Sequence, residues 1–167
     1  MIESVIEKAT KKENLTYEEA RMTMTELMNG TATPVQASAY LVSMAMKGET
    51  IDEIAASAEG MRAAGTKLQT NRKVAEIVGT GGDGSDSFNI STTASFVIAS
   101  AGIPVAKHGN RSASSKSGAA DCLEALGAKI DTDPERNEEI LNETNMCFLF
   151  AKRYHSAMRF VGPVRKE

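Results

Sequence analysis

The sequence has 167 residues, of which 41% are hydrophobic and 25% charged, as in an ordinary globular protein. Its 19 basic and 22 acidic side chains give a formal net charge of −3, which predicts no nucleic-acid partner. No stretch approaches the ~18 consecutive apolar residues of a membrane span, so no membrane partner is expected either. Cys122 and Cys147 form no Cys-x-x-Cys pair, and we expect reduced thiols in a cytoplasmic protein.

Residues 1–66 are predicted to form a helical domain. A short helix near residues 4–10 comes first. Thr16 and Glu19 then form a capping-box pattern, in which each side chain can satisfy an unpaired amide of the first helical turn. Apolar residues follow at helical spacing, and Gly30 ends this helix.

Two further helices are expected in the same domain. Pro34 occupies the first position of a helix over residues 33–48 that is apolar on nearly all sides. Such a helix must be buried in the core or against a partner. A third helix, over residues 50–65, opens with a second capping box from Thr50 and Glu53. Its apolar stripe is expected to consist of Ile51, Ile54, Ala55, Ala58 and Met61.

Residues 73–167 alternate between predicted strands and predicted helices, which implies crossovers and a parallel sheet. The strands are predicted at 74–78, 103–106, 128–130 and 146–150, and the helices at 92–101, at 119–126, from 133 and from 156 to the end. The fold class is therefore α/β, with a small N-terminal helical domain followed by a parallel-sheet domain. Ligands in such sheets bind at the carboxyl ends of strands.

The first candidate loop, 79–92, follows a predicted strand and opens a helix. Its four glycines allow backbone amides to approach an anion, and the helix start offers further amides to a phosphate. A flexible turn with a capping residue is the alternative. The dinucleotide fingerprint fits Gly79, Gly81 and Gly84 only literally, because several residues separate Gly84 from the helix. The aspartates of the loop either cap its backbone or reflect a Mg²⁺ ion that bridges diphosphate oxygens.

The second candidate loop, 107–118, carries three cations, four serines and two glycines. Such a segment can surround a polyanion through charge-assisted hydrogen bonds. A solvated surface loop is the alternative. His108 could act as an acid or base, but a structural role or a carbonyl contact is equally compatible with its position.

These two segments resemble anthranilate phosphoribosyltransferases. The matching stretches are 79–83, 89–92 and 107–115, with supporting matches through 150–165. The resemblance implies transfer of a phosphoribosyl group from phosphoribosyl diphosphate to the amine of anthranilate, with release of diphosphate and assistance from Mg²⁺. It also implies a homodimer formed through the helical domain. No catalytic nucleophile is assigned, because positioning and neutralisation of the diphosphate suffice for this chemistry.

The resemblance also implies a set of binding residues. Contacts with phosphoribosyl diphosphate are expected from Gly79, Gly82, Asp83, Ser87, Asn89, Ile90, Ser91, Thr92, Lys107, His108, Gly109, Asn110, Arg111, Ser112, Ala113, Ser114, Ser115 and Ala119. Anthranilate is expected to contact Gly79, Asn110 and Arg165, and Mg²⁺ to contact Ser91. At Ala119 many relatives have a serine, so that contact is either lost or supplied by the backbone.

The resemblance implies that the family's acidic Mg²⁺-binding pair and its later strands would follow residue 167, so that this chain carries only the first part of the α/β domain. We therefore expect little or no transferase activity from this chain alone. Two other functions remain open. A pyrimidine nucleoside phosphorylase-like enzyme would share the architecture, although residues 89–92 and 107–111 favour the transferase. A non-catalytic helical dimerisation module is the other, and the intact loop residues argue against it.

Overall fold

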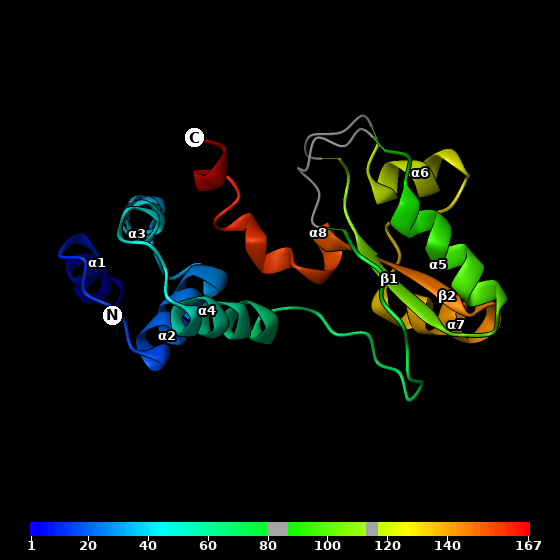
Figure 1. Ribbon diagram of the computed structural model, residues 1–167, viewed down its shortest axis with the longest axis horizontal. Coiled ribbons are helices and arrows are strands. Elements are labelled where there is room, and N and C mark those ends of the chain that lie inside the picture. Colours follow the sequence, from blue (N-terminus) through cyan, green and yellow to red (C-terminus); the bar gives the residue numbers. More distant parts are fainter. Residues whose placement is uncertain (80–86, 113–116) are drawn as a thin grey trace. The chain divides into compact units, whose positions relative to one another are not determined.

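A computed structural model describes residues 1–79, 87–112 and 117–167 (Figure 1). The chain divides into two compact units, which we call unit 1 and unit 2. Unit 1 comprises Met1–Gly65 and His155–Glu167, and unit 2 comprises Thr66–Tyr154. Among the helices of the described residues, none has the length and apolar character needed to cross a membrane.

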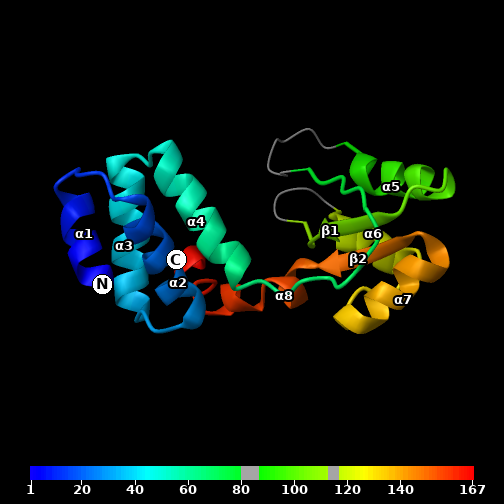
Figure 2. The same cartoon turned by 90° about the horizontal axis from the view of Figure 1, so that it is seen from below.

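Unit 1 is a bundle of the N-terminal helices, and the C-terminal segment of the chain belongs to the same unit (Figure 2). Its elements are α1 (Ile2–Thr10), α2 (Tyr17–Asn29), α3 (Pro34–Lys47), α4 (Ile51–Ala63), η1 (Ser156–Arg159) and η2 (Val164–Lys166). In α2, α3 and α4 a threonine precedes the helix, and its hydroxyl accepts a 3.2 Å hydrogen bond from the amide three residues later. The side chain at that later position accepts a bond from the threonine amide in return. The predicted helix starts are thereby confirmed.

The packing face of α4 differs from the predicted stripe. Ile51 and Ile54 are 86% and 58% exposed, and the buried residues are Glu53, Ala56 and Gly60. The reason is the close approach of α2: a Cβ atom at Gly60 would lie 2.9 Å from the backbone oxygen of Arg21. At this point of contact only a residue without a side chain fits, and the large apolar side chains Ile51 and Ile54 point away from the buried face.

Helix α3 contributes only one of its faces to the core of unit 1. Tyr40 and Met44 are buried there, whereas Val35, Val42 and Met46 on the other face are 78%, 55% and 77% exposed. Of the two alternatives predicted for this helix, burial in the core of its own bundle is therefore wrong for its second apolar face. Its second apolar face is open in the single chain.

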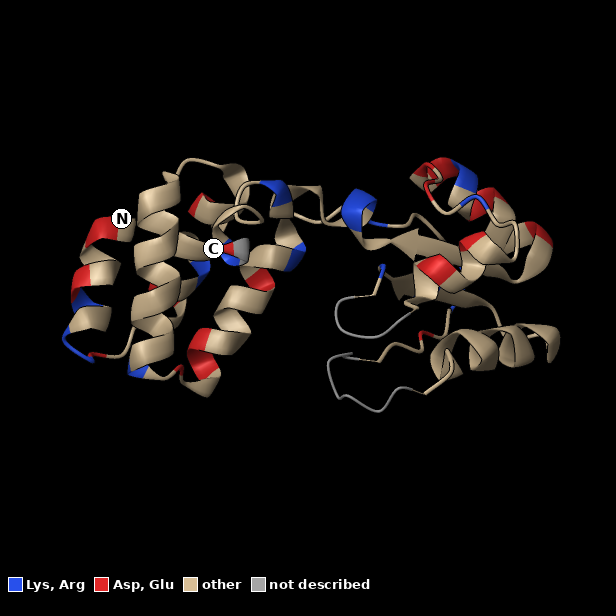
Figure 3. Ribbon diagram, turned by 90° about the horizontal axis from the view of Figure 1, so that it is seen from above, with Lys and Arg blue, Asp and Glu red and all other residues tan. Residues whose placement is uncertain are grey.

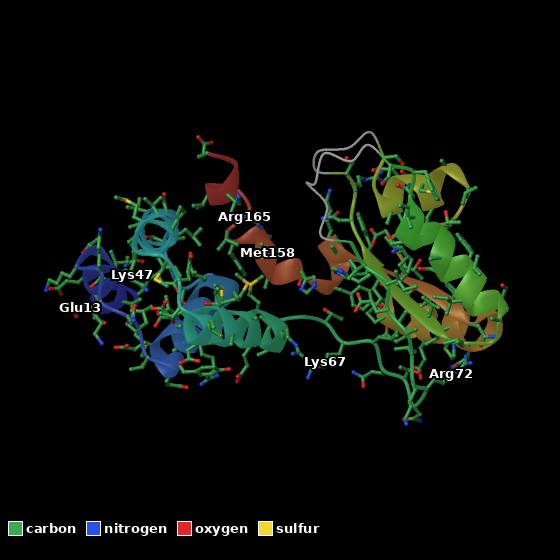
Figure 4. The ribbon with its side chains drawn as sticks, viewed as in Figure 1. Glu13, Lys47, Lys67, Arg72, Met158 and Arg165 are labelled. Atoms are coloured by element: carbon green, nitrogen blue, oxygen red, sulfur yellow. The ribbon has the colours of Figure 1, made fainter. Side chains whose placement is uncertain are left out.

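A buried ion pair lies beside the apolar core of unit 1. The Lys47 Nζ atom donates to the Glu53 carboxylate at 2.8 Å, and the amides of Leu15 and Thr50 donate to the same carboxylate at 2.7 Å each. Figure 4 labels Lys47 among the helices of this unit. Burial raises the pKa of Glu53, but these hydrogen bonds outweigh burial and hold that pKa below its ordinary value.

Unit 2 contains the α/β part of the chain. Its elements are α5 (Ile90–Ser100), β1 (Val105–Gly109), α6 (Ala119–Ala125), α7 (Pro134–Thr144), β2 (Met146–Phe150) and α8 (Ala151–Tyr154). Strands β1 and β2 pair in parallel, with Val105 opposite Met146 and Gly109 opposite Phe150. Helices α5 and α7 lie on opposite faces of the strands (Figure 2). The two faces carry separate apolar clusters, one with Leu123 of α6 and one with Leu141 of α7.

Several predicted strands of this unit differ from the observed ones. The segment 74–78 makes a single parallel bridge, from Ala75 to Val105. Val74 and Val78 on its other side are exposed, so only alternate residues have packing partners. The strand predicted at 103–106 is shifted to 105–109, after Pro104, which lacks the amide a ladder needs.

Two more elements near the C-terminus were predicted wrongly. The segment 128–130 is not a strand: it follows the positive-φ residue Gly127, and Ile130 packs against the α6 cluster instead of pairing with a strand. The helix predicted from 156 consists of the two short turns η1 and η2. Strand β2 matches the predicted 146–150 segment.

Candidate functional site

The candidate site residues of unit 2 gather where β1 ends and where α5 and α6 begin. Residues 89–92 form the start of α5, residues 107–109 belong to β1, and Ala119 is the first residue of α6. Hydrogen bonds between these segments bring the two candidate loops together. The expected placement of both loops at the carboxyl end of a parallel strand holds for β1.

Lys107 is the central cation of this cluster. Its side chain is buried, with only 1% of the residue exposed, and its Nζ donates to the Ile77 carbonyl at 2.8 Å and to the Ser91 hydroxyl at 3.2 Å. Burial lowers the pKa of Lys107, and the nearby charge of Glu76 opposes this shift. Lys107, which lies in β1, is thus bonded both to the end of the 74–79 segment and to the start of α5.

The N-terminus of α5 offers an electrostatic setting suited to an anion. No charged side chain lies on this helix (Figure 3). The amides of a helical first turn carry a partial positive charge. The hydroxyl of Thr92 is buried in this turn and has no hydrogen-bond partner among the described residues. A buried polar atom of this kind costs free energy unless a ligand or water satisfies it.

The described ends of the second loop are held by Asp121 of α6. Its Oδ2 atom accepts from the amides of Ser112 at 2.9 Å and Gly118 at 2.8 Å, and its Oδ1 atom pairs with Arg111 at 2.9 Å. These bonds, led by that from Ser112, hold the pKa of Asp121 below its ordinary value. Sequence reasoning did not assign Asp121 to the site. The available signal was its place three residues after Gly118, in a capping position.

Arg111 is paired within the protein. Its guanidinium contacts Glu124 at 2.8 Å as well as Asp121, and these carboxylates raise its pKa above the ordinary value. The sequence suggested that Arg111 contacts the diphosphate. In this structure two carboxylates already balance its charge.

Gly118 connects the two candidate loops. The Asn89 side-chain amide donates to the Gly118 carbonyl at 3.3 Å and to the Ser117 hydroxyl at 3.2 Å. A Cβ atom at Gly118 would lie 2.3 Å from the backbone nitrogen of Ser112, which no side chain could tolerate without a shift of the backbone. Glycine is therefore required here by close approach of the two chain segments.

The other residues that were predicted to bind substrate are less closely grouped. Gly79 and Ser87 are exposed, His108 is half-buried in β1, and Ala119 packs against the apolar cluster of α6. Arg165 is exposed in η2 of unit 1 (Figure 4). Five of the predicted binding residues lie outside the described residues: Gly82, Asp83, Ala113, Ser114 and Ser115.

The described residues provide one predicted metal ligand, the Ser91 hydroxyl. Within those ranges no group of three or more His, Cys, Asp or Glu residues could hold a metal ion. A hydroxyl oxygen suits Mg²⁺, which prefers oxygen ligands and usually retains waters and phosphate oxygens. The Lys107 ammonium, 3.2 Å from this hydroxyl, repels a bare cation. The site therefore fits Mg²⁺ only in company with an anion.

A separate cavity of about 720 Å³ lies elsewhere in unit 2. Mainly apolar side chains from α5, α7 and β2 line it, including Phe96, Ile140 and Met146. None of the predicted binding residues that the structure describes lies on its wall. Because the lining is mainly apolar and does not include Lys107 or the first turn of α5, we do not place the chemistry there.

Comparison with known families identifies both parts of the chain. Residues 71–167 match the family model of the glycosyl transferase family a/b domain. Residues 3–65 match that of the helical bundle domain of the same family. The chain belongs to this glycosyl transferase family.

Its relatives include proteins named anthranilate phosphoribosyltransferase. The one from Methanobrevibacter smithii is 59% identical over all of this chain, and the one from Lachnoclostridium phytofermentans is 56% identical. In each case the match covers 50% of the relative. The family member described here thus spans about half the length of the curated relatives it matches.

Solved structures agree with the fold. The anthranilate phosphoribosyltransferase of Thermus thermophilus matches 97% of this chain with a TM-score of 0.89 and 48% identity, over 50% of its own chain. The Saccharomyces cerevisiae enzyme, solved in complex with PRPP and Mg, matches 99% with a TM-score of 0.83 at 24% identity, again over 50% of its own chain. The second likeness bears on the fold alone.

Proposed function

We propose that this protein is an anthranilate phosphoribosyltransferase that binds phosphoribosyl diphosphate at the carboxyl end of β1. The observation that carries the proposal is the buried Lys107 ammonium, hydrogen-bonded only to neutral oxygens among the described residues, beside the N-terminus of α5. A buried cation with no carboxylate in hydrogen-bond contact is costly unless an anion accompanies it. Diphosphate would supply that charge.

The proposed chemistry uses this chain mainly for positioning and charge neutralisation. As the bond between the sugar and the diphosphate breaks, negative charge grows on the leaving group. The positive charge of Lys107 and the first-turn amides of α5 would stabilise that negative charge, because the Lys107 side chain is largely shielded from water. An ammonium has three donors, and Lys107 directs two of them to Ile77 and Ser91 in the described structure. No described residue accepts from the third, which would bind a phosphate oxygen.

Mg²⁺ is part of this proposal. Ser91 would hold it together with the diphosphate, and the bound ion would supply further neutralisation of the leaving group. For anthranilate, we propose contacts from Gly79, from the side chain of Asn110 and from Arg165, whose guanidinium suits a carboxylate. The remaining predicted ligands of phosphoribosyl diphosphate belong to the same proposal.

We further propose a homodimer through unit 1. The exposed residues Val35, Val42 and Met46 recur on one face of α3, and burial of this face against a second copy would remove their apolar surface from water. A cytoplasmic location is consistent with the two cysteines, which are free thiols. Sedimentation of the wild type and of Val42→Glu tests the dimer, and a monomeric wild type would refute it.

Turnover of anthranilate tests the activity. The chain is mixed with the polypeptide equivalent to the second half of the Methanobrevibacter smithii relative, and the change in anthranilate fluorescence is followed with phosphoribosyl diphosphate and Mg²⁺. We expect conversion by the mixture and little or none by this chain alone. Lys107→Met should reduce conversion by about 10²-fold, as does loss of a comparable charge-stabilising group. Lys152→Met, which removes an exposed lysine of unit 2, should not.

Other outcomes would contradict the proposal. Robust phosphorolysis of a pyrimidine nucleoside with inorganic phosphate, without conversion of anthranilate, would favour the nucleoside phosphorylase alternative. Absence of both reactions, together with no binding of phosphoribosyl diphosphate, would favour a helical dimerisation module.

A further inference from the structure

We propose that Asp121 is a positioning residue of the candidate site, which fixes the two described ends of the second loop and, through Gly118, their place beside the start of α5. This inference rests on the proposed binding of phosphoribosyl diphosphate. Asp121 itself is not proposed to touch phosphoribosyl diphosphate, anthranilate or Mg²⁺. It would act through the residues on either side of it in space: Asn110, Arg111 and Ser112 after β1, and Gly118 before α6.

The geometry of the carboxylate carries the first step of the argument. One oxygen, Oδ2, accepts from the amides of Ser112 at 2.9 Å and Gly118 at 2.8 Å. These two residues lie on either side of residues 113–117, so a single atom sets the distance between Ser112 and Gly118. The other oxygen, Oδ1, pairs with Arg111 at 2.9 Å. Hydrogen bonds of amides to a charged acceptor are stronger than those between neutral groups.

The second step links this anchor to the other loop. Gly118 donates its amide to Asp121, while its carbonyl accepts from the side chain of Asn89 at the start of α5. On the other side of the loop, the Asn110 carbonyl accepts from the Ala120 amide at 3.1 Å, within the first turn of α6. A change at Asp121 therefore reaches both candidate loops within two hydrogen bonds.

A purely local role is the alternative, since Asp121 lies at the third position of α6 and its bond from Gly118 is an ordinary capping bond. The bonds from Ser112 and Arg111 go beyond that role. Both residues lie outside α6, and neither bond is needed to begin the helix. Capping alone accounts for one of the three interactions.

Three variants separate the two roles. Asp121→Ala removes every acceptor. Asp121→Asn keeps one side-chain oxygen, which can accept from both backbone amides. Its side-chain NH₂ group would then face Arg111, whose charge Glu124 still neutralises. Glu124→Gln is the matched control, because it removes a neighbouring partner of Arg111 but leaves both amides bonded. For each, hydrogen exchange at the Ser112 and Gly118 amides, thermal unfolding and calorimetric titration with phosphoribosyl diphosphate and Mg²⁺ are measured.

We expect Asp121→Ala to speed exchange at both amides and to weaken binding roughly tenfold or more at temperatures where the chain stays folded. Asp121→Asn should restore most of the affinity, and Glu124→Gln should bind like the wild type. Equal affinity in Asp121→Ala and wild type, with both amides exchanging faster, would overturn the positioning role and leave capping alone. Unchanged exchange at Ser112 would overturn the anchor itself. A wild type that binds no phosphoribosyl diphosphate would refute the proposed function, whereas the exchange data would still test the anchor.

Discussion

Each unit of the molecule buries a charged side chain, and the two charges are balanced in different ways. In unit 1, Glu53 is matched by Lys47 and by two backbone amides, so this ion is satisfied by the protein itself. In unit 2, Lys107 is bonded to a carbonyl and a hydroxyl, both neutral, among the described residues. Because the first charge is matched by an ion pair and the second forms no ion pair among the described residues, we assign stability to Glu53 and propose ligand binding for Lys107.

Removal of the charge at Glu53 gives the largest expected effect on stability. Glu53→Gln leaves the buried Lys47 ammonium without its counter-ion, and loss of one partner of a buried pair typically costs about 3–5 kcal/mol. We expect the lower end, because glutamine retains one acceptor. Chemical unfolding followed by circular dichroism measures the change. Glu59→Gln, on the exposed side of α4, is the control and should leave stability nearly unchanged; equal losses in both variants would contradict the buried-pair account.

Acid should remove the same interaction. The folded-state pKa of Glu53 lies below its ordinary value of 4.5, so its stabilisation is complete above about 4.5 and is lost as pH falls through the lowered pKa. We expect wild-type unit 1 to lose stability across this acidic range and Glu53→Gln to show a flatter profile. Parallel acid profiles in the two proteins would argue against this assignment.

A substitution at Gly118 should disturb unit 2 and leave unit 1 intact. The Cβ atom of Gly118→Ala would collide with backbone atoms of residues 110–112, and overpacking of this kind costs about 1–3 kcal/mol. Amide exchange should rise near Ser112 and α6. Gly79→Ala, where an added Cβ meets nothing within 4 Å, is the matched control for stability. Normal protection around Ser112 in Gly118→Ala would show that the close approach is relieved at no cost.

Loss of a helix cap in unit 1 should have a smaller effect. Thr33→Ala removes the hydroxyl that accepts from Gln36 at the start of α3, a loss worth about 1 kcal/mol. Ser38→Ala, at an exposed position inside the same helix, should be neutral or slightly stabilising because alanine favours helices. Thermal unfolding of the two variants tests this order, and a Ser38→Ala loss as large as that of Thr33→Ala would contradict it.

The helix starts of unit 1 could be predicted from the sequence because capping is local. Thr16 and Glu19 lie three residues apart, and the physical interaction needs nothing else. The packing face of α4 could not be predicted, since Gly60 and Glu53 are buried by α2 and by Lys47, neither of which local periodicity reveals. The extent of the strand predicted at 74–78 was wrong for the same reason, because Ala75 pairs with a residue thirty positions later, whereas the predicted parallel pairing is confirmed.

The candidate site divides along similar lines. The sequence correctly brought residues 89–92 and 107–109 to one region, because the carboxyl end of a strand and a helix start are chain-local signals. It did not show that Arg111 is neutralised by Glu124, nor that Asp121 holds Ser112 and Gly118. These contacts depend on how α6 folds back against the end of β1.

Calorimetric titration of this chain with phosphoribosyl diphosphate, with and without Mg²⁺, tests the central claim most directly. We expect saturable binding in the presence of Mg²⁺, no detectable binding of Mg²⁺ alone, and loss of binding in Lys107→Met under conditions where circular dichroism shows that the variant is folded. Absence of binding to the wild type, or undiminished binding to folded Lys107→Met, would contradict the assignment of the buried Lys107 charge to a diphosphate ligand.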